Sequence, residues 1–156
     1  MVFDRENEMS DAQRVAALVQ LASDPVQLAS AQHAAAARLL SYDGEVYPHD
    51  GCAITLSVLL QNAGIDVDDT YQAIQLGHVL GSEREWQRVQ VGEQRPGDVG
   101  STCGQQPHHG YGHIYLVLKV LNPDAMVIAD NQEPNPHFRF ASGKGKTPTK
   151  FFLRAS

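Results

Sequence analysis

"GCAITLSVLLQNAG", residues 51–64, is the stretch that decides the fold. Ala53, Leu56 and Leu60 recur at helical spacing, and other apolar side chains of the stretch lie on its remaining faces. A helix that is apolar nearly all round is buried. Gly64 is a favourable C-terminal stop. The stretch therefore predicts the central helix of the domain, beginning at about Cys52.

The position of Cys52 allows two interpretations. A thiol reacts as the thiolate, and the partial positive charge of a helix N-terminus favours that anion. The backbone N–H of Cys52 would also be free to stabilise an oxyanion. These arguments predict that Cys52 is a nucleophile with a depressed thiol pKa and that the pKa of Cys103 is not depressed. The alternative is a small buried core residue.

The rest of the chain predicts helices first and strands afterwards. Ser10 and Gln13 form a capping box ahead of one helix, and Asp24 with Pro25 begins a second. Residues 41–51 are rich in turn formers and predict a loop. A fourth helix is expected within residues 68–81, capped near Asp69 or Thr70. Five segments rich in β-branched and aromatic residues predict strands, and they are 86–91, 97–102, 113–121, 125–132 and 149–155.

This order indicates an α+β fold with an antiparallel sheet of about five or six strands. Residues 133–148 are rich in Pro and Gly and predict a surface connection. We expect one domain over residues 1–156, with 1–40 as a helical N-terminal extension and 41–156 as a catalytic core. No internal repeat is visible.

Composition argues against several classes of protein. Twelve basic and eighteen acidic residues give a net charge of −6, which disfavours a nucleic-acid binder and an electrostatic membrane anchor. No apolar run approaches the roughly 20 residues that span a bilayer. The first residues lack the pattern of a secretory signal, so we expect synthesis in the cytoplasm without a leader. A Cys52–Cys103 disulfide is disfavoured in a reducing cytosol.

A base for the thiol is expected at His113, which opens the most apolar strand segment of the chain. The Asn-Pro-Asp turn at residues 122–124 predicts a hairpin. That hairpin returns Asp130, Asn131 or Gln132 to the vicinity of His113, where one of them could orient the imidazole. Four other histidines are interpreted as surface or packing residues, and they are His33, His49, His78 and His137.

Four motifs together resemble the papain-like CHAP group (cysteine, histidine-dependent amidohydrolases/peptidases) and the related NlpC-type endopeptidases. They are "GCAITLSVLLQNAG", "RPGDV", "GHIYLVL" and "VIADNQ", in that order and at about the family spacing. The resemblance covers residues 50 to about 132 and extends to the closing "FFLRA" segment. It does not account for residues 1–40.

The resemblance implies roles for individual residues. Cys52 resembles the nucleophile and His113 the general base. Asn131 best resembles the third member of the triad, and Asp130 is the alternative, because adjacent strand residues face opposite ways. Asp98 resembles a structural turn residue. Two further candidates for oxyanion donors are Tyr42 and Tyr47.

The resemblance also implies a function. We expect a cysteine-dependent amidase or endopeptidase that cleaves an amide bond in bacterial peptidoglycan, as a phage lysin or a secreted antibacterial effector does. It would need no cofactor and would act in the periplasm or cell wall after export, delivery or lysis. Its expected partners are a peptidoglycan peptide and, for an effector, a secretion machine or an immunity protein, with no nucleic acid and no membrane.

Three alternatives stay open from the sequence. Papain-like folds also act on proteins, so a protease, deamidase or isopeptide-cleaving enzyme is one. A zinc site is another, because Cys103, His108, His109 and His113 lie within eleven residues and are zinc-ligand types. The third is a binding module without catalytic activity.

Overall fold

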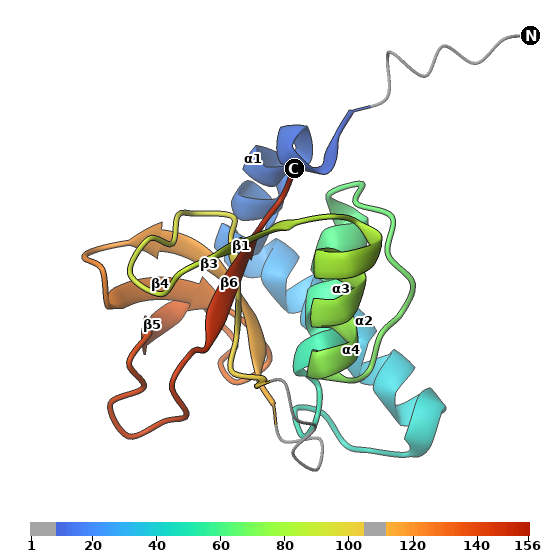
Figure 1. Cartoon of the computed structure of the whole chain (residues 1–156). Helices are drawn as coiled ribbons and strands as arrows, with labels where there is room; N and C mark the ends of the chain where they lie inside the picture. The colour runs from blue at the N-terminus through green and yellow to red at the C-terminus, as the bar shows by residue number, and fades with distance from the viewer. Residues whose placement is uncertain (1–8, 105–111) are drawn as a thin grey trace, which may run out of the picture.

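The computed structural model describes residues 9–104 and 112–156 (Figure 1). Within these residues the chain forms four α-helices, a short π-helical turn and six strands, which confirms the α+β fold. The helices are α1 (Asp11–Ser23), α2 (Pro25–Asp43), α3 (Cys52–Asn62) and α4 (Ala73–His78), and the turn η2 (Val79–Glu83) continues α4. The strands are β1 (Gln87–Val89), β2 (Val99–Ser101), β3 (Ile114–Val120), β4 (Ala125–Ala129), β5 (His137–Phe140) and β6 (Phe151–Arg154).

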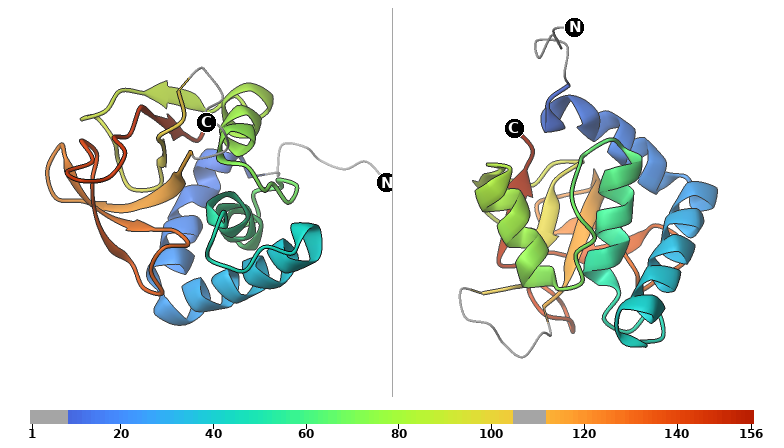
Figure 2. Two further views of the ribbon diagram at one scale, coloured as in Figure 1. Left: turned by 90° about the horizontal axis from the view of Figure 1, so that it is seen from below. Right: turned by 90° about the vertical axis from the view of Figure 1, so that its right-hand side faces the viewer.

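The six strands form one antiparallel sheet in the order β1-β6-β2-β3-β4-β5. Helices α1, α2 and α3 gather on one side of this sheet (Figure 2). The pairing of Leu116 with Ala129 and of Val120 with Met126 confirms the predicted β3–β4 hairpin. A register shift lies between Val117 and Lys119, so one residue of β3 is extra relative to β4.

Helix α3 is the centre of the main core, as its sequence predicts. Every side chain from Cys52 to Leu60 is buried, and the helix packs against α1, α2 and β3. The opposite face of the sheet carries a second, smaller apolar cluster that includes Tyr115, Met126 and Phe152. Strand β3 is therefore buried on both faces over residues 114–118.

The predicted helix caps of the N-terminal region are confirmed. The Gln13 N–H donates to Ser10 Oγ over 3.2 Å, and the Ser10 N–H donates to Gln13 Oε1 over 2.7 Å. The Val26 N–H donates to Asp24 Oδ1 over 2.9 Å, with Pro25 at the first helical position. Helix α2 runs to Asp43, three residues into the predicted loop, and ends at Gly44, whose φ of +78° suits glycine.

Two local predictions are wrong. The predicted surface connection contains β5, which pairs with β4. The Arg139 side chain of β5 is buried over the ring of Tyr115. Its turn-forming residues flank the strand rather than interrupt it. Helix α4 begins at Ala73 rather than near residue 69, because Asp69 accepts hydrogen bonds from Arg38 and Gln61 over 2.8 Å each. That carboxylate is engaged in tertiary contacts and does not cap the helix.

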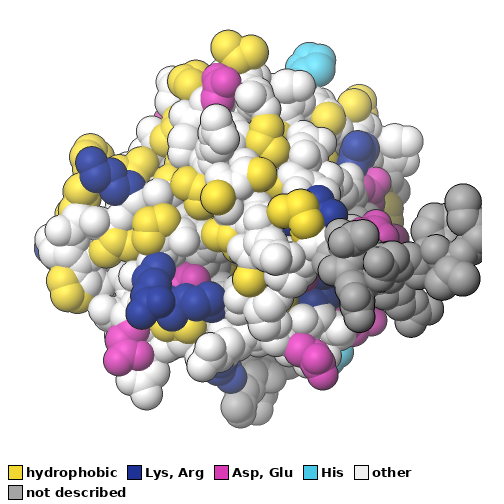
Figure 3. Space-filling model, turned by 90° about the horizontal axis from the view of Figure 1, so that it is seen from above, with side chains coloured by type: hydrophobic (Ala, Val, Ile, Leu, Met, Phe, Trp, Pro, Cys, Tyr) yellow, Lys and Arg dark blue, Asp and Glu magenta, His cyan; other side chains and the backbone are white. Residues whose placement is uncertain are grey.

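The surface shown in Figure 3 carries basic and acidic side chains interspersed among apolar and uncharged ones. On that face, the described Lys and Arg side chains do not merge into one basic patch. None of the described helices combines the length and the apolar character needed to cross a bilayer.

Candidate active site

Cys52 is the first residue of α3 and lies at the end of a closely packed loop. The Gly51 position leaves no room for a side chain, because a Cβ there would lie 2.9 Å from ring carbons of Tyr47. The Thr55 hydroxyl donates to Gly51 O over 2.7 Å, so the Tyr47 hydroxyl, 3.0 Å away, donates to Thr55 Oγ1. The loop is thus held against the first turn of the helix, and Cys52 has little freedom to move.

Burial dominates the chemistry of the Cys52 thiol. The side chain is only 8% exposed, and Sγ donates to Gly112 O over 3.8 Å. Burial raises the pKa of the Cys52 thiol to about 11, although the backbone N–H groups of Ile114 and Ala53 lower it. The predicted depression of this pKa is therefore wrong, because desolvation outweighs the helix terminus. Burial also raises the pKa of Cys103.

His113 is held rigidly at the start of β3. Its N–H donates to Thr102 Oγ1 over 2.8 Å, and its carbonyl accepts from the Thr102 N–H over 3.0 Å. The ring lies 5.9 Å from that of Tyr115, centroid to centroid. Its Nε2 lies 2.8 Å from Asp130 Oδ2. An ionised carboxylate only accepts hydrogen bonds, so Nε2 carries the proton and the neutral ring keeps Nδ1 as its basic nitrogen.

Asp130 follows β4, and its side chain is completely buried. Oδ2 accepts from His113, whereas Oδ1 accepts from His137 Nε2 and from the Gln132 N–H, each over 2.9 Å. Burial raises the pKa of the Asp130 carboxyl, but the hydrogen bonds from the two histidines outweigh it and hold the pKa well below its usual range. Asp130 is therefore an anion in this site.

The structure brings Asp130, not Asn131, to the imidazole of His113. Asn131, which the resemblance favours, donates from Nδ2 to Pro48 O over 2.6 Å. The two neighbours point to different partners, as expected for adjacent residues at the end of a strand. Asn131 instead links the end of β4 to the loop that precedes Cys52.

His137 is a residue of this site that the sequence interpretation missed. The composition of residues 133–148 predicts a surface connection, but His137 begins β5 and lies opposite Ile128 of β4. Its side chain is mostly buried and contacts the same carboxylate as His113. The alternating "HFRF" pattern was the signal for a strand, and a strand pairing with β4 would have brought His137 near Asp130.

Cys52 and His113 open onto one cavity of about 430 Å³. Its walls come from the loop before α3, the start of β3 and the end of β4, and they are Pro48, His49, Asp50, Cys52, Gly112, His113, Asn131 and Gln132. As the first residue of α3, Cys52 has no intrahelical acceptor for its own N–H. This N–H is a candidate oxyanion donor. The Tyr47 hydroxyl donates to Thr55, and Tyr42 stacks on Tyr71 at 3.8 Å, so neither tyrosine lines the cavity.

The N-terminal extension supports the site from behind. Gln32 of α2 is buried, and its Nε2 donates to the carbonyl oxygens of Asp130 and Glu133 over 2.9 and 2.8 Å. These two bonds hold the backbone that carries the Asp130 carboxylate. Through Gln32, helix α2 thus contributes directly to the positioning of the site, although the resemblance does not explain this part of the chain.

Two of the four candidate zinc ligands, Cys103 and His113, lie within the described residues. His108 and His109 lie outside the described residues. Cys103 packs against Gly112, where an added Cβ would collide with its Sγ. Among residues 9–104 and 112–156, the three side chains whose donor atoms lie close enough to share a metal ion are Glu45, His49 and Asp50.

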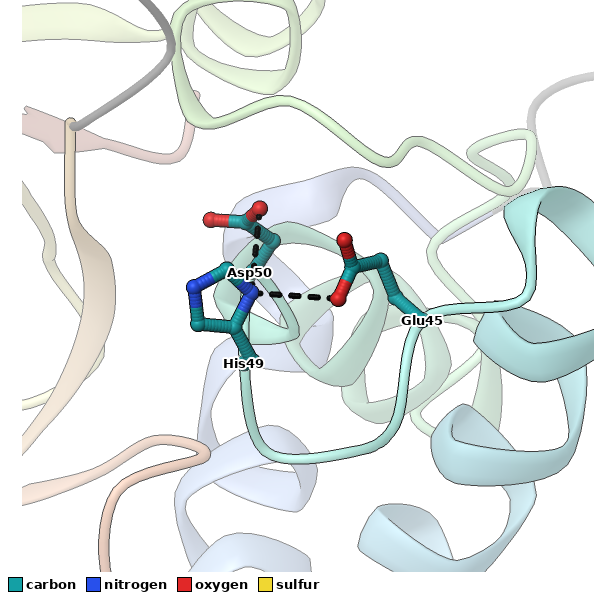
Figure 4. A group of neighbouring side chains, drawn as sticks. All are labelled: Glu45, His49 and Asp50. Atoms are coloured by element: carbon teal, nitrogen blue, oxygen red, sulfur yellow. Dashed lines mark hydrogen bonds and ion pairs between the residues drawn. The ribbon is translucent and has the colours of Figure 1, made fainter.

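Figure 4 shows this group, of which His49 and Asp50 line the cavity. His49 Nδ1 is 3.2 Å from Glu45 Oε2 and 3.3 Å from Asp50 Oδ2. His49 and Asp50 are exposed to solvent, which agrees with the interpretation of His49 as a surface residue. Ordinary surface hydrogen bonding accounts for the arrangement.

Searches with family models, among curated proteins and among solved structures find no match to this chain.

Proposed function

We propose that the protein is a cysteine-dependent amidase or endopeptidase, with Cys52 as nucleophile, His113 as general base and acid, and Asp130 as the residue that orients His113. The observation that carries the proposal is a single cavity lined by the thiol and the imidazole, with a buried carboxylate hydrogen-bonded to Nε2 of that imidazole. A thiol, an imidazole and a carboxylate that orients the imidazole are the three groups that nucleophilic acyl transfer by a cysteine enzyme uses.

The high pKa of Cys52 specifies how the first step proceeds. At neutral pH the isolated thiol is protonated, so its proton must pass to His113 Nδ1 as Sγ attacks the amide carbonyl carbon. The new C–S bond forms as the carbonyl electron pair moves to oxygen, where the Cys52 N–H can donate to it. Asp130 balances the positive charge that develops on the imidazole.

The remaining steps return the site to its starting state. The imidazolium gives its proton to the leaving nitrogen, the C–N bond breaks, and an amine and a thioester form. His113 Nδ1 then takes a proton from water as the water oxygen attacks the thioester. The C–S bond breaks, the proton goes to sulfur, and a carboxylic acid leaves.

We propose an amide of bacterial peptidoglycan as the substrate, within the stem peptide or cross-bridge or at the sugar–peptide link. The motifs around Cys52, His113 and residues 127–132 support this choice through their resemblance to wall hydrolases. The acidic net charge of −6 supports a target other than nucleic acid.

The test is mass spectrometry of purified peptidoglycan fragments after incubation with the protein. We expect new amine and carboxyl termini with the wild type and none with Cys52→Ala. In cells, fusion to a periplasmic leader should cause lysis that Cys52→Ala abolishes. If a folded wild type releases no termini and the periplasmic form is harmless, the peptidoglycan proposal fails and protein amides become the substrates to test.

A further inference from the structure

Two histidines share one buried carboxylate, and the mechanism above uses only one of them. His113 donates to Asp130 Oδ2 and His137 donates to Oδ1 over 2.9 Å. Both rings are mostly buried; His113 immediately precedes β3, whereas His137 is the first residue of β5. No step of acyl transfer requires the second imidazole, so its place against the carboxylate calls for a different role.

We infer that His137 is a positioning residue, which holds the Asp130 carboxylate in the plane that presents Oδ2 to His113. This inference rests on the proposed function, because it assigns a role within the same site. It adds a fourth residue to the Cys52, His113 and Asp130 arrangement.

The geometry gives the physical reason. A carboxylate can rotate about its Cβ–Cγ bond, and terminal torsions of this kind are broad. The His113 bond alone would leave that rotation weakly restrained. His137 and the Gln132 N–H both donate to Oδ1, while His113 donates to Oδ2. Each carboxylate oxygen thus has its own hydrogen-bond donor, which restrains the rotation. The imidazole of His113 then keeps its orientation as its charge changes during turnover.

The fold fixes the positions of both His137 and Asp130. The pairing of His137 with Ile128 fixes β5 beside β4, and Gln32 of α2 donates a hydrogen bond to the backbone carbonyl of Asp130. The donor and the acceptor are therefore placed by separate elements of the fold. A residue that merely filled space there would not need a nitrogen within hydrogen-bond distance of the carboxylate.

Two amide substitutions distinguish the effect of the hydrogen-bond donor from the effect of side-chain volume. His137→Gln places an amide nitrogen near the position of Nε2, whereas the amide of His137→Asn reaches only the position of Nδ1. His33→Asn, on the exposed face of α2, is the matched control. The measurements are kcat and KM for amide hydrolysis, the rate of Cys52 alkylation by chloroacetamide at pH 7, and the melting temperature.

We expect His137→Asn to lower kcat and the alkylation rate about 10- to 100-fold, as loss of one hydrogen bond to a charged group would, with little change in KM. His137→Gln should recover most of both rates, and His33→Asn should match the wild type. If His137→Asn does not fold, His137→Leu keeps the bulk without the donor and repeats the comparison with His137→Gln.

The inference is overturned if His137→Asn or His137→Leu matches the wild type in both rates while Asp130→Asn does not. It is also overturned if folded His137→Gln is as slow as His137→Asn, because bulk rather than the donor would then matter. Alkylation needs no hydrolase substrate. If the wild type hydrolyses no peptidoglycan, the proposed function fails, but the alkylation rates still decide the role of His137.

Discussion

Replacement of His113 by glutamine should expose the intrinsic acidity of the buried Cys52 thiol. Gln keeps a polar side chain of similar reach but cannot act as a base at neutral pH. Burial sets the pKa of the thiol at about 11, which is roughly four pH units above neutrality. Because each unit is a factor of ten, about one thiol in 10⁴ is ionised at pH 7 in the variant.

The wild type should react much faster at pH 7, because His113 accepts the thiol proton during attack. We expect the alkylation rate of Cys52 in His113→Gln to rise about tenfold per pH unit from pH 6 to 9, without a plateau. At pH 7 the wild-type alkylation rate should exceed the rate of His113→Gln by one to several orders of magnitude, up to a limit of about 10⁴.

The assay is iodoacetamide labelling followed by peptide mass spectrometry, which separates Cys52 from Cys103. His49→Gln is the matched control, because His49 lines the same cavity and is exposed. It should react as the wild type does. The reasoning is refuted if His113→Gln labels Cys52 at pH 7 as fast as the wild type. It is equally refuted if the variant shows an ordinary thiol profile that levels off just above pH 9.0.

Two further predictions concern stability. Gln32→Leu should destabilise the fold by about 1–3 kcal/mol for each carbonyl left unpaired, as urea unfolding would measure. Gln27→Leu on the same helix removes only an exposed 3.3 Å hydrogen bond to Asp24 and should cost much less. The folded pKa of Cys52 is raised from an ordinary value of 9.0 to about 11, so its contribution to stability is present below about pH 9 and is lost as pH rises toward 11. Between pH 9 and 11, the free energy of unfolding should therefore fall more for the wild type than for Cys52→Ala, by up to about 2–3 kcal/mol. Equal losses in the two proteins would contradict the raised pKa of Cys52.

Much of the local structure could be predicted from the sequence because it depends on neighbouring residues. The capping box of Ser10 and Gln13, the start of α3 at Cys52 and the β3–β4 hairpin are all decided within a few residues or across one short turn. The hairpin was enough to place Asp130 and Asn131 near His113, since the end of the second strand must return to the start of the first.

Only the tertiary structure decided which of these residues faces the imidazole and what the thiol can do. The register shift in β3 changes which side chains oppose each other, so strand alternation alone could not choose Asp130 over Asn131. His137 reaches the carboxylate only through the pairing of β5 with β4. Whether a helix terminus or burial governs the acidity of Cys52 depends on how completely distant segments exclude water from it, and that is a property of the packed molecule rather than of any stretch of its sequence.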